Sequence, residues 1–107
     1  MARFKKGWNA TVDVDGEAVE LSFRNPSNQE LSEFLASRWE PGKKGRVKDQ
    51  SHEARCEFFD LLITGVKNLE DEEGNPVTPE RKDVIPSNWK SDIVFKKFEN
   101  SDIEIKN

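Results

Sequence analysis

The chain has 107 residues, of which 36% are charged and only 34% hydrophobic, and its formal net charge is −4. This length predicts a single domain over residues 1–107, with flexible tails at 1–6 and 100–107. The negative charge excludes a general attraction to nucleic acid or acidic membranes, one cysteine excludes an internal disulfide, and no apolar run is long enough to span a bilayer. We therefore expect an intracellular, soluble protein.

The first element is predicted to be a β-hairpin over residues 8–24, because apolar and polar residues alternate there with period two. Asp15-Gly16 interrupts the alternation, and this dipeptide favours the tight turn of a hairpin, which requires positive φ. One face of the hairpin is expected to be apolar; it consists of Trp8, Ala10, Val12, Val14, Val19, Leu21 and Phe23. Such a hairpin is marginal alone, so we expect helices to cover this face.

A helix is predicted to follow from Ser27, because Ser27 and Glu30 have the spacing of a capping box. Its apolar edge is formed by Leu31, Phe34, Leu35 and the pair Arg38-Trp39, and Glu40-Pro41-Gly42 ends it. Residues 41–50 then form an exposed basic loop with two glycines.

The central helix is predicted over residues 51–66, and we expect the rest of the chain to pack around it. Its apolar stripe consists of Ala54, Phe58, Leu62 and Val66, widened by Phe59 and Ile63. Ser51 is the expected cap, and Gly65 lies near the expected end.

The remainder contains an acidic turn and two shorter helices. Leu69 and Val77 are expected to flank a small turn or an irregular hairpin. Thr78 is the expected cap of a short helix that begins at Pro79 and runs toward Asp83. Ser87 is the expected cap of the last helix, whose apolar anchors are Trp89, Ile93, Phe95 and Phe98, with Val94 facing elsewhere or widening the stripe. Beyond Glu99, the tail either frays or adds an edge strand through Ile103 and Ile105. The predicted class is α+β, an N-terminal antiparallel β-hairpin packed against about three helices.

Two acidic stretches resemble metal sites only superficially. Asp13, Asp15 and Gly16 are spaced like the start of a calcium loop, but the twelfth position is then Ser22, where a bidentate Glu is required. The run from Glu70 to Glu73 has two interpretations: a solvated loop, which we favour, or a site for a cation or basic partner.

No catalytic motif accompanies the candidate nucleophile. Cys56 and His52 are neighbours on the predicted helix, as a nucleophile and its base would be. However, the sequence supplies no third member of a triad, and two zinc ligands are too few. Phosphate-binding and nucleophile-elbow motifs are absent from the sequence. We therefore expect no enzyme activity, no cofactor and no metal.

Three segments of this chain resemble the tail assembly chaperone group, small proteins encoded in the tail-gene clusters of siphophages and prophages. They are FRNPSNQELSEFLASRW, SHEARCEFFDLLITGVKNLEDEEGNPVTPE and IPSNWKSDIVFKKFE, which together cover most of residues 23–99. The resemblance implies a non-enzymatic function in the cytoplasm of the bacterial host. It implies binding of the tape-measure protein and the major tail protein, and leaves self-association open.

Aromatic and basic residues are the candidates for partner binding. A holdase for a helical client needs accessible apolar side chains with a polar surround. The candidates are Trp39, Trp89, Phe95 and Phe98, together with Lys43, Lys44, Arg46 and Lys48 of the basic loop. Two alternatives remain: a small nucleic-acid-binding module that uses residues 43–48 on phosphates, and a structural component of the tail.

Overall fold

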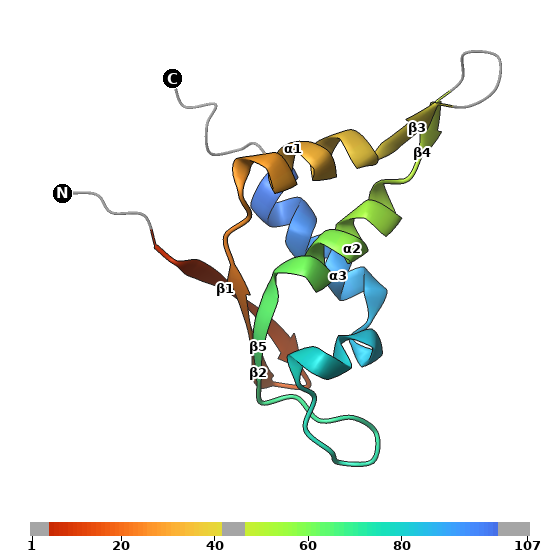
Figure 1. The fold of residues 1–107 in the computed structure, drawn as a ribbon. Helices are drawn as coiled ribbons and strands as arrows, with labels where there is room; N and C mark the ends of the chain where they lie inside the picture. Colours follow the sequence, from red (N-terminus) through yellow and green to blue (C-terminus); the bar gives the residue numbers. More distant parts are fainter. Residues whose placement is uncertain (1–4, 42–46, 101–107) are drawn as a thin grey trace. The chain divides into compact units, whose positions relative to one another are not determined.

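The computed structural model describes residues 5–41 and 47–100 (Figure 1). Their internal contacts form two compact units: a sheet unit of residues 5–26 and 62–85, and a helical unit of residues 27–41, 47–61 and 86–100. The α+β class and the N-terminal hairpin are confirmed. A single domain over the whole chain stays a prediction. Among the described residues, no helix has both the length and the apolar character needed to cross a membrane.

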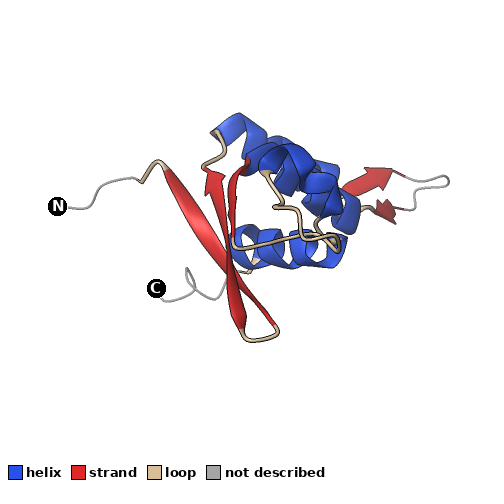
Figure 2. Ribbon diagram, turned by 90° about the horizontal axis from the view of Figure 1, so that it is seen from below, coloured by secondary structure: helices blue, strands red, loops and turns tan. Residues whose placement is uncertain are grey.

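The hairpin of the sheet unit consists of β1 (Gly7–Val14) and β2 (Glu17–Arg24), which pair in antiparallel fashion along their whole length. Figure 2 shows them as two long strands joined by a tight turn. Asp15 and Gly16 have φ values of 52° and 86°, the positive values that a two-residue hairpin turn requires. The Gly16 N–H donates a 3.0 Å hydrogen bond to the Asp13 carboxylate. The predicted turn is therefore confirmed.

The register of the hairpin places six of the seven predicted apolar residues opposite one another, so that they share one face; the seventh, Val14, is opposite Glu17. Trp8 is opposite Phe23, and their rings stack with centroids 4.2 Å apart. Ala10 and Val12 lie opposite members of the same face, and β2 contributes its most buried residues: Val19, Leu21 and Phe23, each at most 3% exposed. Gly7 is required at the end of β1, because a Cβ there would lie 2.2 Å from the Phe23 carbonyl oxygen.

A third strand, β5 (Ile63–Lys67), completes the sheet in the order β1-β2-β5. The prediction of a helix through Val66 is wrong, because the helix ends at Leu62 and Val66 pairs with Leu21. Ile63, Thr64 and Val66 are β-branched, which favours a strand once a partner strand is present. Gly65 does not end a helix; it lies opposite Ser22. Helical periodicity could not predict this pairing, because β2 lies far from β5 along the chain.

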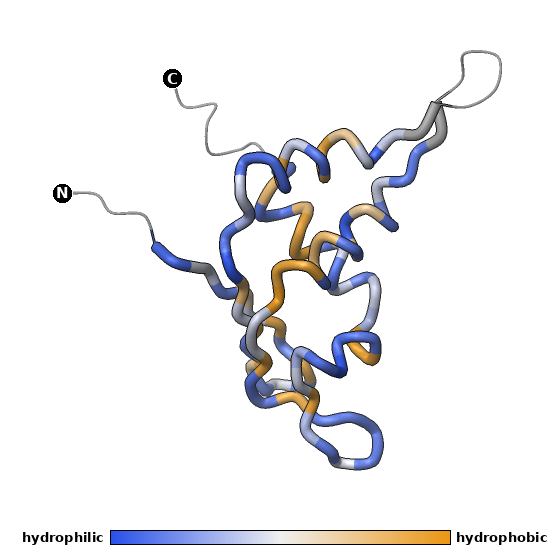
Figure 3. The backbone as a smooth tube through the Cα atoms, in the orientation of Figure 1, coloured by the Kyte–Doolittle hydropathy of each residue, from blue (hydrophilic) through white to orange (hydrophobic). Residues whose placement is uncertain are grey.

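After β5, the acidic turn doubles back as predicted, with the Val77 N–H donating to the Leu69 carbonyl at 2.9 Å. Figure 3 shows the hydrophilic character of this loop. The following 3₁₀ helix, η2 (Pro79–Val84), begins with proline in the first turn, as expected. Thr78 precedes it but makes no side-chain capping bond, so its predicted capping role is wrong.

The helical unit begins with α1 (Asn28–Ser37), and the predicted capping box is present. The Glu30 N–H donates to the Ser27 hydroxyl at 3.1 Å, and the Ser27 N–H donates to the Glu30 carboxylate at 2.9 Å. Trp39 is not helical, contrary to prediction. It begins β3 (Trp39–Pro41), which pairs with β4 (Val47–Asp49), so part of the predicted basic loop is a two-stranded ribbon.

The second helix, α2 (Ser51–Leu62), supplies most of the core of the helical unit. Phe58 stacks on Phe34 of α1 with centroids 4.3 Å apart, and Phe59 is fully buried. Burying one such side chain stabilises a fold by about 1.5–3 kcal/mol. Ser51 is the first helical residue rather than the cap, and its backbone N–H donates to the Asp49 carboxylate at 2.8 Å.

The predicted last helix is two segments, α3 (Ser87–Val94) and the π-helical turn η3 (Phe95–Glu99). Ser87 is already helical and does not cap the helix, since the preceding Pro86 occupies that position. Val94 is fully buried and so belongs to the apolar face, whereas Phe95, a predicted anchor, is exposed. Lys90 is also buried, which apolar periodicity could not predict. The tail beyond Asn100 lies outside the described residues.

Candidate functional site

The four aromatic residues proposed for partner binding have different environments. Trp39 is 50% exposed and Phe95 is 42% exposed, so both are available to a partner. Trp89 is half-buried. Phe98 is also half-buried and packs edge-on against Phe58, with centroids 5.1 Å apart, so it contributes chiefly to the aromatic core. Only two of the four therefore present a largely accessible ring.

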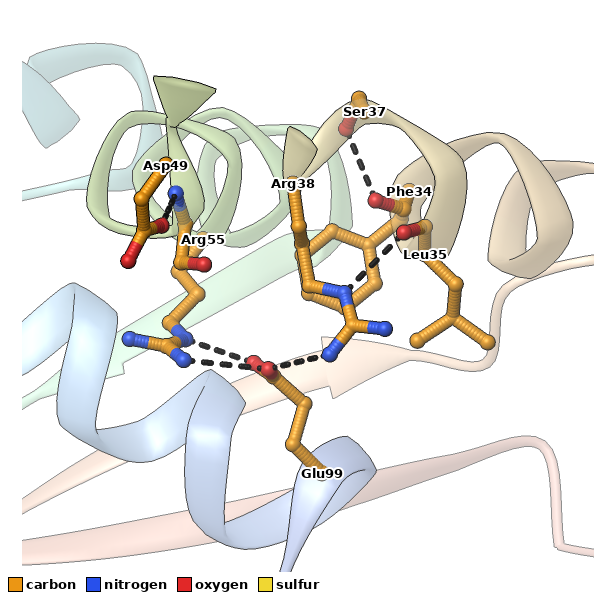
Figure 4. Close-up of polar contacts among 8 residues, drawn as sticks. Phe34, Leu35, Ser37, Arg38, Asp49, Arg55 and Glu99 are labelled. Carbon is orange, nitrogen blue, oxygen red and sulfur yellow. Dashed lines mark hydrogen bonds and ion pairs between the residues drawn. The ribbon is translucent and has the colours of Figure 1, made fainter. Parts of the chain in front are cut away.

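Three charged residues, Arg38, Arg55 and Glu99, form a cluster that we call the Glu99 cluster (Figure 4). Phe95 lies beside it, in contact with Arg55. The Glu99 carboxylate accepts hydrogen bonds from Arg55 Nε at 2.6 Å, Arg55 Nη2 at 3.0 Å and Arg38 Nη1 at 2.8 Å. The Arg55 guanidinium also lies over the Phe95 ring, 5.1 Å from its centroid. The cluster thus joins the C-cap of α1 to α2 and η3, and it places a guanidinium against the Phe95 ring.

The electrostatics of the cluster favour its charged form. Burial by itself raises the pKa of the Glu99 carboxyl, but the hydrogen bonds and charges of Arg55 and Arg38 outweigh burial and lower the pKa below its ordinary value. The pKa of Arg55 is raised, mainly by its hydrogen bonds to Glu99. No sequence pattern pointed to this cluster, because its members lie on three separate elements.

Trp39 is positioned by the backbone of the ribbon. Its strand partner is Asp49, and the adjacent Arg38 carbonyl accepts a 2.8 Å hydrogen bond from the Gln50 N–H. Arg38 itself is held by Glu99 and by the Leu35 carbonyl, which accepts from its Nε at 3.1 Å. An exposed indole on a fixed backbone loses little conformational entropy when a partner covers it.

Of the four basic residues proposed for partner binding, only Lys48 belongs to the described part of the chain. Lys43, Lys44 and Arg46 lie outside the described residues. The backbone of Lys48 belongs to β4 and pairs with Glu40. Their role in binding a protein or a nucleic acid stays a prediction.

Cys56 and His52 are neighbours, as helical spacing predicted, with Sγ and Nε2 3.7 Å apart. The thiol also donates to the Ser87 carbonyl at 3.5 Å. Burial raises the pKa of Cys56; Lys90 opposes this, whereas Asp60, Glu53 and Glu57 reinforce it. The neutral thiol is therefore favoured, although a nucleophilic cysteine reacts as the thiolate.

The acidic turn is organised around Asp71. Its carboxylate accepts from the Glu73 and Asn75 N–H groups, each at 2.9 Å, and from Arg81 Nη2 at 2.7 Å. These contacts lower the pKa of Asp71, with the Arg81 hydrogen bond contributing most. Glu72 and Glu73 are exposed. Within the described ranges, no group of three metal-ligating side chains is arranged to hold an ion.

One exposed apolar residue of the helical unit was not among the candidates. Leu61, on the last turn of α2, is 49% exposed. It lies seven residues after Ala54 and three after Phe58, at the edge of the apolar stripe, and this spacing was the signal that could have identified it.

Comparison with known proteins identifies no relative of this chain: no family model, no curated protein and no solved structure is significantly similar to it.

Proposed function

We propose that this protein is a non-enzymatic accessory protein of phage tail assembly, which acts in the bacterial cytoplasm by binding the tape-measure protein, the major tail protein or both. The resemblance of residues 23–99 to tail assembly chaperones motivates the proposal. The structural observation that supports it is the exposure of large apolar side chains on the helical unit: Trp39, Leu61 and Phe95, at 50%, 49% and 42%.

The client, rather than this protein, creates the need for an accessible apolar surface. A long helical protein that waits for assembly exposes apolar stripes, and these aggregate unless another apolar surface covers them. Exposed Trp and Phe are effective for this purpose, because each buries a large area with few rotatable bonds. Arg55 beside Phe95 supplies the polar surround that keeps such a surface soluble between clients.

Co-expression with the tape-measure protein of the same phage tests the proposal. The full chain is expected to keep the client soluble and to co-purify with it. Replacing Trp39 and Phe95 together by Ser is expected to reduce recovery of the client about tenfold or more, as for central interface aromatics. The matched control replaces Glu72 and Glu73, two exposed residues of the acidic turn, by Ser, and should leave recovery unchanged.

Three results would contradict the proposal. The client is equally soluble without this protein, or the aromatic variant protects it as well as the wild type. Alternatively, the protein is retained in finished particles, which would make it a structural tail component. A gel shift with DNA that weakens steeply with salt would instead support the nucleic-acid alternative through the basic loop.

A further inference from the structure

A groove lies between α1 and α2, within the helical unit. Each helix lines it with four residues at the spacing i, i+3, i+4 and i+7, which is one continuous helical edge. The lining residues are Glu30, Glu33, Phe34 and Ser37 from α1, and Ala54, Glu57, Phe58 and Leu61 from α2. The groove is open to solvent and encloses about 330 Å³. Its length is about two helical turns, roughly 10 Å.

The apolar part of the groove has a buried base and is accessible at one end. Phe34 and Phe58 form the base; their rings are stacked with an interplanar angle of 2°, and each residue is 4% exposed. Leu61 is 49% exposed and provides the accessible apolar area. A leucine-sized side chain that enters beside Leu61 would therefore meet a preformed apolar surface, with little reorganisation of the groove.

All charged residues that line the groove are acidic. Three of its eight lining residues are glutamates, and none of these described residues is basic. Glu33 accepts a 3.2 Å hydrogen bond from the uncharged Gln29 amide, and this contact leaves its charge uncompensated. Glu57 is exposed on the opposite wall, on α2. An occupant with apolar side chains and flanking lysines or arginines would complement both the base and the walls.

From these features we infer that the α1/α2 groove binds a basic amphipathic helix of the client. The occupant presents apolar residues at i, i+3 or i+4 and i+7 toward Leu61 and the two phenylalanines, and basic residues toward Glu33 and Glu57. This inference rests on the proposed function, because it assigns the surface and the client chemistry through which the protein acts. Acidic or uncharged helices are expected to bind more weakly.

Binding of designed peptides to the full chain tests the inference. The probe is a fluorescein-labelled helical peptide built from Leu and Lys, and the comparison peptide has the same pattern with Glu in place of Lys. Fluorescence anisotropy is expected to give a dissociation constant at least tenfold lower for the Lys peptide. This preference should shrink when NaCl is raised from about 50 to 500 mM, because exposed charges are screened.

Matched variants locate the binding surface. Reversing two charges with E33K and E57K is expected to weaken binding of the Lys peptide about tenfold or more. Replacing Leu61 by Ser should weaken both peptides, because it removes the accessible apolar area. The control E72K and E73K reverses the same number of glutamates in the acidic turn and should change binding less than twofold. Circular dichroism of each variant checks that the helices are retained.

The inference is overturned if the control weakens binding as much as E33K and E57K, since binding would then follow net charge alone. It is also overturned if the Lys peptide does not bind, or if sedimentation shows that the groove is closed by a second copy of the chain. Failure of the proposed function is distinguishable: the Lys peptide would still bind the groove while the tape-measure protein is not protected. Conversely, the variant with E33K and E57K could still protect the client while the variant without Trp39 and Phe95 does not. That result would refute the groove as the binding surface and leave the proposed function standing.

Discussion

Replacing Glu99 by Gln is expected to destabilise the fold, because this carboxylate joins three elements of the helical unit. The Glu99 side chain is 5% exposed and pairs with Arg38, which is 25% exposed, and with Arg55, which is 21% exposed. The substitution keeps the shape of the side chain and one carbonyl acceptor but removes the negative charge. Both arginines then lose a charge-assisted partner.

The expected loss of stability in E99Q depends on how deeply Glu99 and its two arginine partners are buried. Removing one member of a fully buried ion pair costs about 3–5 kcal/mol. Water still reaches about a quarter of each arginine side chain and the glutamine carbonyl accepts one hydrogen bond, so we expect a smaller loss of about 2–3 kcal/mol. For a domain of this size, that loss corresponds to a fall in Tm of about 8–15 °C.

Urea unfolding followed by circular dichroism measures this loss, with an unchanged m-value as the sign that only stability has changed. The matched control is Asp92→Asn, which removes an ion pair with Lys96 whose side chains are 59% and 67% exposed. This control is expected to cost less than about 0.5 kcal/mol. A loss below about 1 kcal/mol for E99Q, or one no larger than for the control, would refute the reasoning.

The pH dependence provides an independent check. The pKa of Glu99 is lowered in the folded state, because the arginines outweigh the effect of burial. The unfolded state therefore binds the proton more tightly, and the stabilisation is present above the ordinary pKa of about 4.3 and is lost as pH falls through the folded value. The difference in stability between wild type and E99Q should thus be largest near pH 7 and shrink below pH 4. A difference that stays constant from pH 7 to 3 would contradict the assignment.

Three further predictions concern other parts of the chain. Gly7→Ala is expected to disrupt the end of β1, since its Cβ would lie 2.2 Å from the Phe23 carbonyl oxygen; a wild-type Tm would contradict this. Asp71→Asn removes the charge that holds Arg81 and should make the acidic turn more sensitive to limited proteolysis, with cleavage at the wild-type rate as the refuting result. Cys56 should react with iodoacetamide at pH 8 more slowly than glutathione does, because its pKa is raised, and a faster reaction would mean that the thiolate is stabilised.

Features that depend on neighbouring residues could be predicted from the sequence. The Asp15-Gly16 turn, the capping box of Ser27 and Glu30, and the proline at the start of η2 all occur where local patterns indicated. The apolar face of the hairpin also followed from alternation. Trp39 and Phe95, which are exposed, were among the candidates for partner binding, but periodicity could not separate them from the half-buried Phe98, because whether an aromatic is covered depends on packing with other elements.

The tertiary structure alone decided the features that need distant partners. Ile63 continues a helical pattern, yet it lies in β5, because β2 offers backbone hydrogen bonds and a buried position there. Glu99 ended the predicted last helix without any assigned role, and only folding brings it to Arg38 and Arg55. The sequence by itself therefore determined the hairpin turn, the Ser27/Glu30 capping box and the α+β class, since these depend on nearby residues. Strand pairing, buried charges and the acidic groove arose only from the fold, because each requires residues far apart in the chain to come into contact.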